Sequence, residues 1–339
     1  MESVGRDLIT KKLKEKKAKT LKHWLKLSEF KLQWSIFAVL VGIFTLFIVG
    51  DPKTFLNFDI YYSFMSTIPF MAIMALAWTP VIICKEIDLS FPSIMGFSGW
   101  ICLAVFTSTG NVTLAVVSSL ITGLLAGLLN GILVVKVGVP SLIVTIGTMF
   151  FWKGLILVCS GVMGGSLVAA KGTVLFKSLV GRIGGAVPAQ ALWTVGIAFL
   201  FWLILNRHKF GSHIYFTGDN IESARMMGIP VNRVRILVFA QLGFFAAFAG
   251  ILANFEFLYW WTTAGSGYLL KTIAAVFLGG TSAFGGTGTI FGTFVGSIII
   301  GSLESGIVGV GLAEFWTQVV YGLIIVISVS VHSILRRRM

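Results

Sequence analysis

Residues 206–235 read NRHKFGSHIYFTGDNIESARMMGIPVNRVR, and this long polar, charged stretch lies between two apolar runs. Asp219 or Asn220 can cap the start of a helix, Gly228 can close its end, and Pro230 prevents its continuation. The stretch therefore predicts a short helix of about two turns between two membrane spans, placed to contact something soluble. An ordinary solvated loop is the alternative that the spacing alone leaves open.

The composition around this stretch assigns the protein class. Hydrophobic residues make up 56% of the 339 residues, charged residues only 12%, and the mean hydropathy is +0.94. A soluble domain typically carries about 25% charged residues, so most of this chain must lie in lipid. We predict an all-α integral membrane protein with a basic segment at 1–31, one transmembrane domain at 32–335 and a short tail at 336–339.

Membrane spans need roughly 20 mostly apolar residues. Suitable runs lie at 32–49, 64–84, 91–106, 112–135, 142–159, 191–205, 236–253, 289–303 and 315–331. A shorter apolar segment at 271–280 ends in glycines and predicts a half-helix or re-entrant piece, which brings the count to ten. The run LGGTSAFGGTGTIFG at 278–292 lacks the Lys-Ser/Thr of a phosphate loop, so we interpret it as a break between two half-helices.

Positive charge predicts the orientation. Of 26 Lys and Arg residues, ten lie in 1–31, five in 206–235 and three in 336–338. Basic clusters mark the cytoplasmic side, and an even number of predicted crossings separates each cluster from the next. Both termini are therefore expected in the cytoplasm, provided that the 271–280 segment crosses. The net charge of +13 then reflects topology and lipid contact, and a nucleic-acid partner is not expected.

Two further segments are each open to two interpretations. In 1–31, apolar and Lys residues at helical spacing predict a basic helix lying on anionic lipids, with a disordered basic tail as the alternative. The Gly-rich segment 161–190 falls outside the cell by this count. It either receives an external partner or forms a solvated cover.

Small residues recur every four positions in two places. Such spacing puts them on one helix face and lets another backbone approach closely. One set in each half of the chain suggests a weak internal repeat of the kind that transporters use, and simple helix packing is the other interpretation. The two sets are Gly123, Gly127 and Gly131, and Gly288, Gly292 and Gly296.

Polar residues at membrane depth are costly and often mark a solute pathway. The candidates are Asp88, Asn130, Thr145, Thr148, Asn254, Glu256 and Gln318. For any single one of them, hydrogen bonding between helices is the favoured interpretation, and Asp88 could instead cap a helix that begins at Ser90. No Ser-His-Asp order, H-E-x-x-H motif or metal-ligand spacing occurs, so we expect no catalytic, cofactor or metal site in this chain.

Four ordered blocks resemble the permease subunits of bacterial ABC importers, in the branch that includes the ribose, xylose, arabinose, galactose and autoinducer-2 permeases. They are IDLS at 87–90, NGILVVKVGVPSLIVTIGTM at 130–149, GDNIESARMMGI at 218–229 and TAGSGYLLKTIAAVFLGGTSAFGGTGTIFGTFVG at 263–296. The ribose-type permease is the nearest comparison. Lys85-Glu86 and Phe91-Pro92 depart from the family pattern, and so do Tyr259-Trp260-Trp261 and Glu304, which leaves the solute open.

The resemblance implies a mechanism and partners. Two permease subunits, identical or paralogous, would form the pathway, a periplasmic protein would deliver the solute, and a cytoplasmic ATPase would bind ATP and Mg²⁺. The short helix would be a coupling helix that seats in the ATPase. The expected contact residues are Gly218, Asp219, Asn220, Glu222, Ala224, Arg225, Gly228 and Ile229.

The expected function is therefore import of a small carbohydrate across the bacterial inner membrane. A polyol, a nucleoside or autoinducer-2 is the alternative solute. A stand-alone secondary transporter would need an ion-binding constellation in the core, and a membrane scaffold would give the capped helix no purpose.

Overall fold

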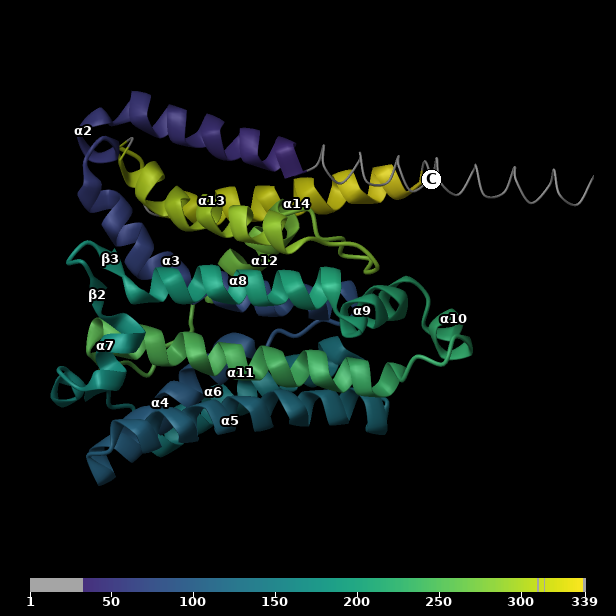
Figure 1. The fold of residues 1–339 in the computed structure, drawn as a ribbon, viewed down its shortest axis with the longest axis horizontal. Helices are drawn as coiled ribbons and strands as arrows, with labels where there is room; N and C mark the ends of the chain where they lie inside the picture. Colours follow the sequence, from purple (N-terminus) through teal and green to yellow (C-terminus); the bar gives the residue numbers. More distant parts are fainter. Residues whose placement is uncertain (1–32, 310, 314, 338–339) are drawn as a thin grey trace, which may run out of the picture.

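The computed structural model describes residues 33–309, 311–313 and 315–337, so the segment predicted at 1–31 lies outside the described residues. Within that part, the helices run mostly side by side in one bundle (Figure 1). One end of the bundle carries α7 (Val174–Val180), and the other carries α10 (Ile221–Met226). We call these the α7 end and the α10 end. The first described helix, Gln33–Gly50, begins toward the α10 end, and α14 (Trp316–Arg337) finishes toward it.

The predicted spans all appear as helices. They are Gln33–Gly50, α3 (Phe58–Ile83), α4 (Phe91–Thr109), α5 (Val112–Ile132) with the π-turn Leu133–Val137, α6 (Ser141–Ser160), α8 (Ala189–Arg207), α11 (Val231–Phe257), α13 (Ile290–Gly309) and α14. The tenth, α12 (Tyr268–Leu278), is only 11 residues long. The prediction of a multi-pass helical membrane protein is confirmed.

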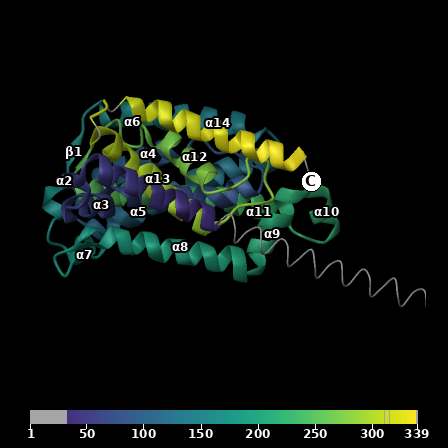
Figure 2. The same cartoon turned by 90° about the horizontal axis from the view of Figure 1, so that it is seen from above.

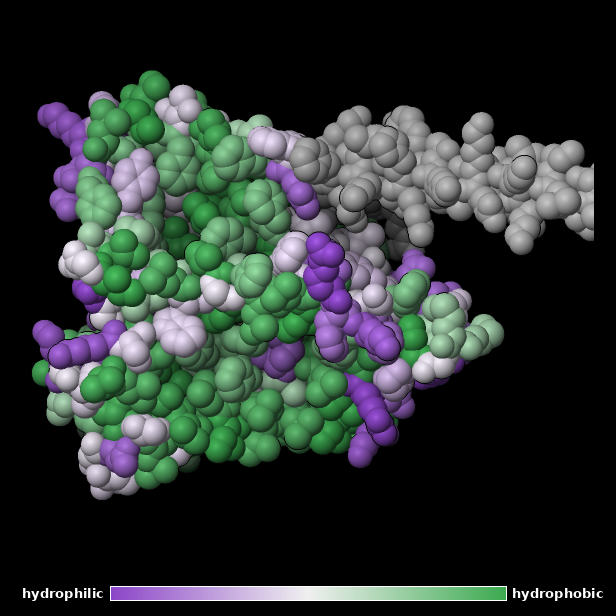
Figure 3. Space-filling model, in the orientation of Figure 1, coloured by the Kyte–Doolittle hydropathy of each residue, from purple (hydrophilic) through white to green (hydrophobic). Residues whose placement is uncertain are grey.

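Two helices form the centre of the bundle. In α3, 94% of the most apolar window is buried, and α11 is next with 72%. The outer helices expose apolar side chains instead, and only 22% of the most apolar window of α6 is buried. Figure 3 shows this apolar surface across the middle of the molecule, with hydrophilic residues gathered toward its two ends. Apolar side chains that face outward around a buried core are expected of a protein whose solvent is lipid.

Two crossings are interrupted by irregular backbone. Residues 84–90 lead from α3 into α4, and residues 258–267 lead from α11 into α12. Trp260 is buried, and its Nε1 donates to Gly96 O at 3.0 Å. A Cβ on Gly265 would lie 1.9 Å from Pro92 O, so the second segment packs directly on the start of α4. Irregular backbone is tolerated at membrane depth only where protein covers it, as it does here.

The predicted half-helix lies between α8 and α14. Figure 2 shows these two helices on opposite sides of the bundle, with α12 and α13 between them. After α12 ends, residues 279–289 turn the chain back into α13. The break that we predicted over 278–292 is therefore present.

Short elements close the two ends. The α7 end carries α2 (Pro52–Phe55), the 3-10 turn Val168–Ala170 and two antiparallel ribbons. The ribbons pair β1 (Gly165–Ser166) with β4 (Tyr259–Trp260), and β2 (Arg182–Ile183) with β3 (Val187–Pro188). No pattern in the sequence predicts these two-residue strands.

The polar stretch 206–235 is more helical than we predicted. An additional helix, α9 (Lys209–Asp219), precedes the short one, and α11 begins as early as Val231. At the far end, α14 continues through Arg337, so the tail predicted at 336–339 begins inside a helix. Charged residues therefore extend these helices beyond their apolar runs.

Candidate coupling surface and translocation pathway

The short helix α10 begins and ends where its sequence predicts. Asn220 is its cap, and its Oδ1 accepts from Ser223 N at 3.0 Å, whereas Asp219 ends the preceding helix. Gly228 follows with a φ of 77°, which a side chain would strain. The helix has six residues, and Ala224 is its buried contact with the bundle, beside the half-buried Ile229.

The outer face of α10 suits a protein partner. Glu222 and Arg225 are exposed and form an ion pair at 3.1 Å. Beside them Met226 is 83% exposed and Met227 is 56% exposed. Met and Arg are enriched in the cores of protein interfaces, and Met adapts to irregular partner surfaces. Our sequence analysis missed the two Met residues, although the pair stands out in the otherwise polar sequence ESARMMG.

Helix α9 connects α10 to the bundle through Gly218. A Cβ on Gly218 would lie 1.6 Å from Ile83 O and 2.9 Å from Gly286 N, so α9 touches the backbone of two other segments there. Gly286 N also donates to Ile83 O at 2.9 Å. Gly218 lies inside α9, where the absence of a side chain permits this close packing.

Two side chains reinforce this junction. Lys85 Nζ donates to Asp219 O at 2.7 Å, and the Tyr215 hydroxyl donates to Gly288 O at 2.8 Å. Lys85 belongs to the irregular segment before α4, and Gly288 to the turn between α12 and α13. The α3–α4 connection and the turn between α12 and α13 are therefore both linked to α9 by backbone packing and hydrogen bonds. A displacement of α10 would reach both.

Asp88 and Asn130 meet at the start of α4. Asp88 Oδ1 accepts from Ser90 N and Ser90 Oγ, both at 2.7 Å. Asn130 Nδ2 donates to Asp88 Oδ2 at 3.1 Å and to Ser90 Oγ at 2.8 Å. All three residues are fully buried. The geometry fits the capping role that we considered for Asp88, and Asn130 from α5 satisfies the remaining carboxylate oxygen.

The two threonine candidates lie on α6 beside the same segment. Thr145 Oγ1 donates to Ser141 O at 2.8 Å and lies 3.2 Å from Ile87 O. Thr148 Oγ1 reaches Thr145 O at 3.4 Å. Both hydroxyls thus bond to backbone near the α3–α4 connection. Gln318 is exposed on α14 and is not brought together with the other candidates.

Asn254 lines a cavity of about 130 Å³ beside the second interrupted crossing. Its Nδ2 donates to Gly99 O at 3.0 Å. The cavity is also lined by Met95, Trp261, Ser266 and Tyr268. Of our pathway candidates, Asn254 is the one that lines this cavity.

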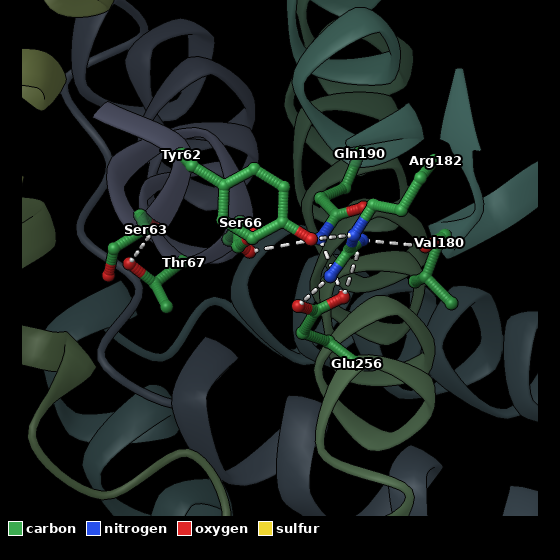
Figure 4. Close-up of polar contacts among 8 residues, drawn as sticks. All are labelled: Tyr62, Ser63, Ser66, Thr67, Val180, Arg182, Gln190 and Glu256. Carbon is green, nitrogen blue, oxygen red and sulfur yellow. Dashed lines mark hydrogen bonds and ion pairs between the residues drawn. The ribbon is translucent and has the colours of Figure 1, made fainter. Parts of the chain in front are cut away.

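Glu256 lies in a polar network at the α7 end (Figure 4). Arg182 donates to both of its oxygens, at 2.5 and 3.1 Å, and Gln190 Nε2 donates to Oε2 at 2.9 Å. Arg182 also donates to the Tyr62 hydroxyl and to Val180 O. Burial disfavours the charged guanidinium, but hydrogen bonds to Glu256 and Tyr62 outweigh it and raise the pKa of Arg182. The ion pair with Glu256 therefore ties β2 to α11, and a pathway role for Glu256 stays a prediction.

The glycine sets pack helices closely. A Cβ on Gly123 would lie 2.4 Å from Gly243 O, and one on Gly127 would lie 2.3 Å from Phe239 O; Gly131 also faces α11. In the other half, Gly292 and Gly296 face Gly279 and Ala275 of the α12 region. Gly288 precedes α13 and lies against Thr281. The first set joins α5 to α11, and the second folds α13 back on α12.

Comparisons with a family model and with similar proteins all find permease components. The model of the family described as "branched-chain amino acid transport system / permease component" matches residues 60–329. The ribose import permease of Bacillus subtilis strain 168 is 34% identical over 295 residues, covering 85% of this chain and 90% of its own length. That of Escherichia coli K12 is 33% identical over 264 residues, covering 77% and 82%.

An autoinducer-2 import permease of Yersinia enterocolitica is 30% identical over 291 residues, covering 84% of this chain and 78% of that protein. No solved structure matches the chain significantly. The matches span the two interrupted crossings, α9 and α10. The chain therefore belongs to the ABC-importer permease-component family and is a multi-pass protein of the bacterial inner membrane.

Proposed function

We propose that this chain is the transmembrane subunit of an ATP-driven, binding-protein-dependent importer for a small carbohydrate, with the α10 end in the cytoplasm. The arrangement of α10 carries the proposal. It is a capped helix with exposed Arg225, Met226 and Met227, and α9 connects it to the α3–α4 connection and to the turn between α12 and α13. A soluble motor that moved α10 would thereby move these two segments.

The proposed orientation follows from charge and from the fold. Residues 206–235 hold five Lys and Arg residues, and the Arg-rich end of α14 lies toward the same end of the bundle. Because positively charged loops favour the cytoplasm, we infer that both termini lie there. The α7 end would then face the periplasm, and its exposed 161–190 segment would receive the solute-binding protein.

Carbohydrate import is favoured by the relatives and by the cavity beside Asn254. The similar proteins with high coverage are named as ribose and autoinducer-2 permeases. The cavity offers the amide of Asn254 and the hydroxyls of Thr263, Ser266 and Tyr268. Uncharged donors and acceptors match the hydroxyls of a neutral sugar. A polyol, a nucleoside or autoinducer-2 is the alternative solute.

The remaining partners follow from the family. A separate ATPase would bind ATP and Mg²⁺ and carry the hydrolysis, so the chain itself would need no cofactor. A second permease subunit, identical or paralogous, would complete the pathway, and lipid would cover the apolar belt. A secondary transporter would need an ion-binding constellation in the core, but the carboxylates of Glu86, Glu256 and Glu304 each form an ion pair. The buried Asp88 is instead held by hydrogen bonds from Ser90 and Asn130.

The test is ATP hydrolysis in proteoliposomes that contain the chain with its ATPase and binding protein. Arg225→Glu is compared with Lys209→Glu, a charge reversal at the same end but outside α10. We expect hydrolysis to be stimulated by one solute among pentoses, hexoses and polyols, and the stimulation to be lost with Arg225→Glu alone. An ATPase that neither co-purifies with the chain nor responds to any solute would overturn the proposal.

A further inference from the structure

A second cavity, of about 530 Å³, lies between α3, α12 and α13. Pockets that hold small molecules typically measure about 300–1,000 Å³, so the volume suits a monosaccharide. Thr54 of α2 and Gly309 at the end of α13 place one end of the cavity at the α7 end. Tyr268 lines both this cavity and the smaller one beside Asn254. The two cavities therefore adjoin at the first residue of α12.

The walls of the cavity differ in chemistry. Ile68 and Met71 of α3 give an apolar wall. Tyr268 and Lys271 of α12, with Glu304 of α13, give a polar one. A sugar ring has a similar division between its C–H face and its hydroxyl edge. Apolar lining with a few convergent polar groups is the usual composition of a small-molecule site.

An ion pair marks the polar wall. Lys271 Nζ donates to Glu304 Oε2, and the two side chains are 30% and 37% exposed, so their charged groups remain accessible from the cavity. Placing charge at membrane depth is costly, which makes such a pair a candidate for function. The hairpin does not depend on it for packing, because Gly279 and Gly292 already bring the backbones of α12 and α13 together.

The pair also sets which solutes fit. Its net charge is zero, so it attracts neither anions nor cations strongly. The ammonium group offers three donors and the carboxylate offers only acceptors. A hydroxyl both donates and accepts, so neighbouring hydroxyls of one molecule can bond to both groups at once.

We propose that this cavity binds a neutral polyhydroxylated solute during transport, with Lys271 and Glu304 as the residues that hold its hydroxyls. The inference rests on the proposed importer function and adds the site and the solute class. Under it the solute enters from the α7 end and passes Tyr268 to reach the cavity beside Asn254. The alternative is that the pair only stabilises the α12–α13 hairpin.

The experiment uses the complete transporter in proteoliposomes, with D-ribose as the probe. The variants are Lys271→Met, Glu304→Gln and the double variant, which removes both charges while keeping similar side-chain volume. Uptake, ATP hydrolysis and the thermal midpoint of the complex are measured for each. We expect the double variant to retain the wild-type midpoint, because removing both members of a partly buried pair is often neutral. Its uptake should fall by roughly tenfold or more, since hydrogen bonds to charged groups are lost.

A labelling measurement provides a readout that does not depend on transport. Cys84 and Cys102 are buried and Cys159 is exposed, so Ser305→Cys in a Cys159→Ser background places a reactive thiol in the cavity. D-ribose should slow its modification by a hydrophilic thiol reagent, and the double variant should abolish that protection.

The outcomes separate this inference from the proposed function. In one outcome, the wild-type complex takes up D-ribose while the double variant keeps full uptake and full protection. That result overturns the inference and leaves the importer function intact. If the wild-type complex responds to another neutral sugar or polyol and not to D-ribose, the same measurements are made with that solute and decide the inference. A complex that responds to none of these solutes overturns the importer function itself. Uptake and protection that are both lost at an unchanged midpoint support the site.

Discussion

Gly218→Ala is the most informative single substitution in this chain. The added Cβ would lie 1.6 Å from Ile83 O and 2.9 Å from Gly286 N, whereas real Cβ atoms almost never lie within 3.0 Å of another heavy atom. Both obstructing atoms belong to the backbone, so no side chain can rotate away. Gly218 has no positive φ, and the effect is therefore purely steric.

The expected size follows from this geometry. To clear the contact, α9 must move away from the end of α3 by about 1.4 Å, the difference between 3.0 and 1.6 Å. Forcing extra atoms into a packed site costs about 1–3 kcal/mol. The hydrogen bond from Gly286 N to Ile83 O would be strained as well, and its loss would add about 0.5–1.5 kcal/mol. We expect a total destabilisation of about 2–4 kcal/mol at the junction.

The assay compares solute-stimulated with basal ATP hydrolysis of the reconstituted complex, alongside its thermal midpoint. Gly218→Ala should leave basal hydrolysis on the partner ATPase and abolish the stimulation, because α10 no longer moves with α3 and the α12–α13 turn. Gly196→Ala is the matched control, since nothing lies within 4 Å of its Cβ and α8 exposes it. Wild-type stimulation and an unchanged midpoint in Gly218→Ala would refute the linkage through α9.

Two further substitutions test the polar networks. Asn130→Leu leaves the buried Asp88 Oδ2 without its hydrogen bond from Asn130. We expect this to lower the free energy of unfolding by about 1–3 kcal/mol. An unchanged thermal midpoint would contradict the expectation. Glu256→Gln removes the ion pair with Arg182, which is partly solvent-screened, so we expect a loss of about 1–2 kcal/mol that shrinks as salt is added. A loss that is the same at low and high salt would argue against an electrostatic role for this pair.

Much of the fold is encoded locally and could be predicted. Apolar runs give the spans, and Asn220 with Gly228 gives both ends of α10. Helix α9 was missed because a polar stretch was read as a loop. Its signal is weak but present, since Gly211, Ile214 and Gly218 recur at helical spacing and are its buried face.

The candidate site was less accessible because it depends on contacts distant in sequence. Arg182 and Glu256 are 74 residues apart, and no local pattern pairs them. Gln318 is a pathway candidate by sequence, yet α14 carries it on an exposed face. In the sequence, Glu304 is notable only because it departs from the family pattern. Its partner Lys271 is identified by the fold, in which α13 packs back on α12. Sequence identifies polar groups at membrane depth, and the fold decides which of them meet.

Site-specific photo-crosslinking tests the central claim most directly. A photoreactive benzoyl-phenylalanine replaces Met226 at the tip of α10 or, as a control, Ser178 on α7, both of which are exposed. The complex with its ATPase is then irradiated in membranes. We predict a crosslink to the ATPase from position 226 and none from position 178. An ATPase crosslink from position 178 with none from position 226 would contradict both the orientation and the coupling role of α10.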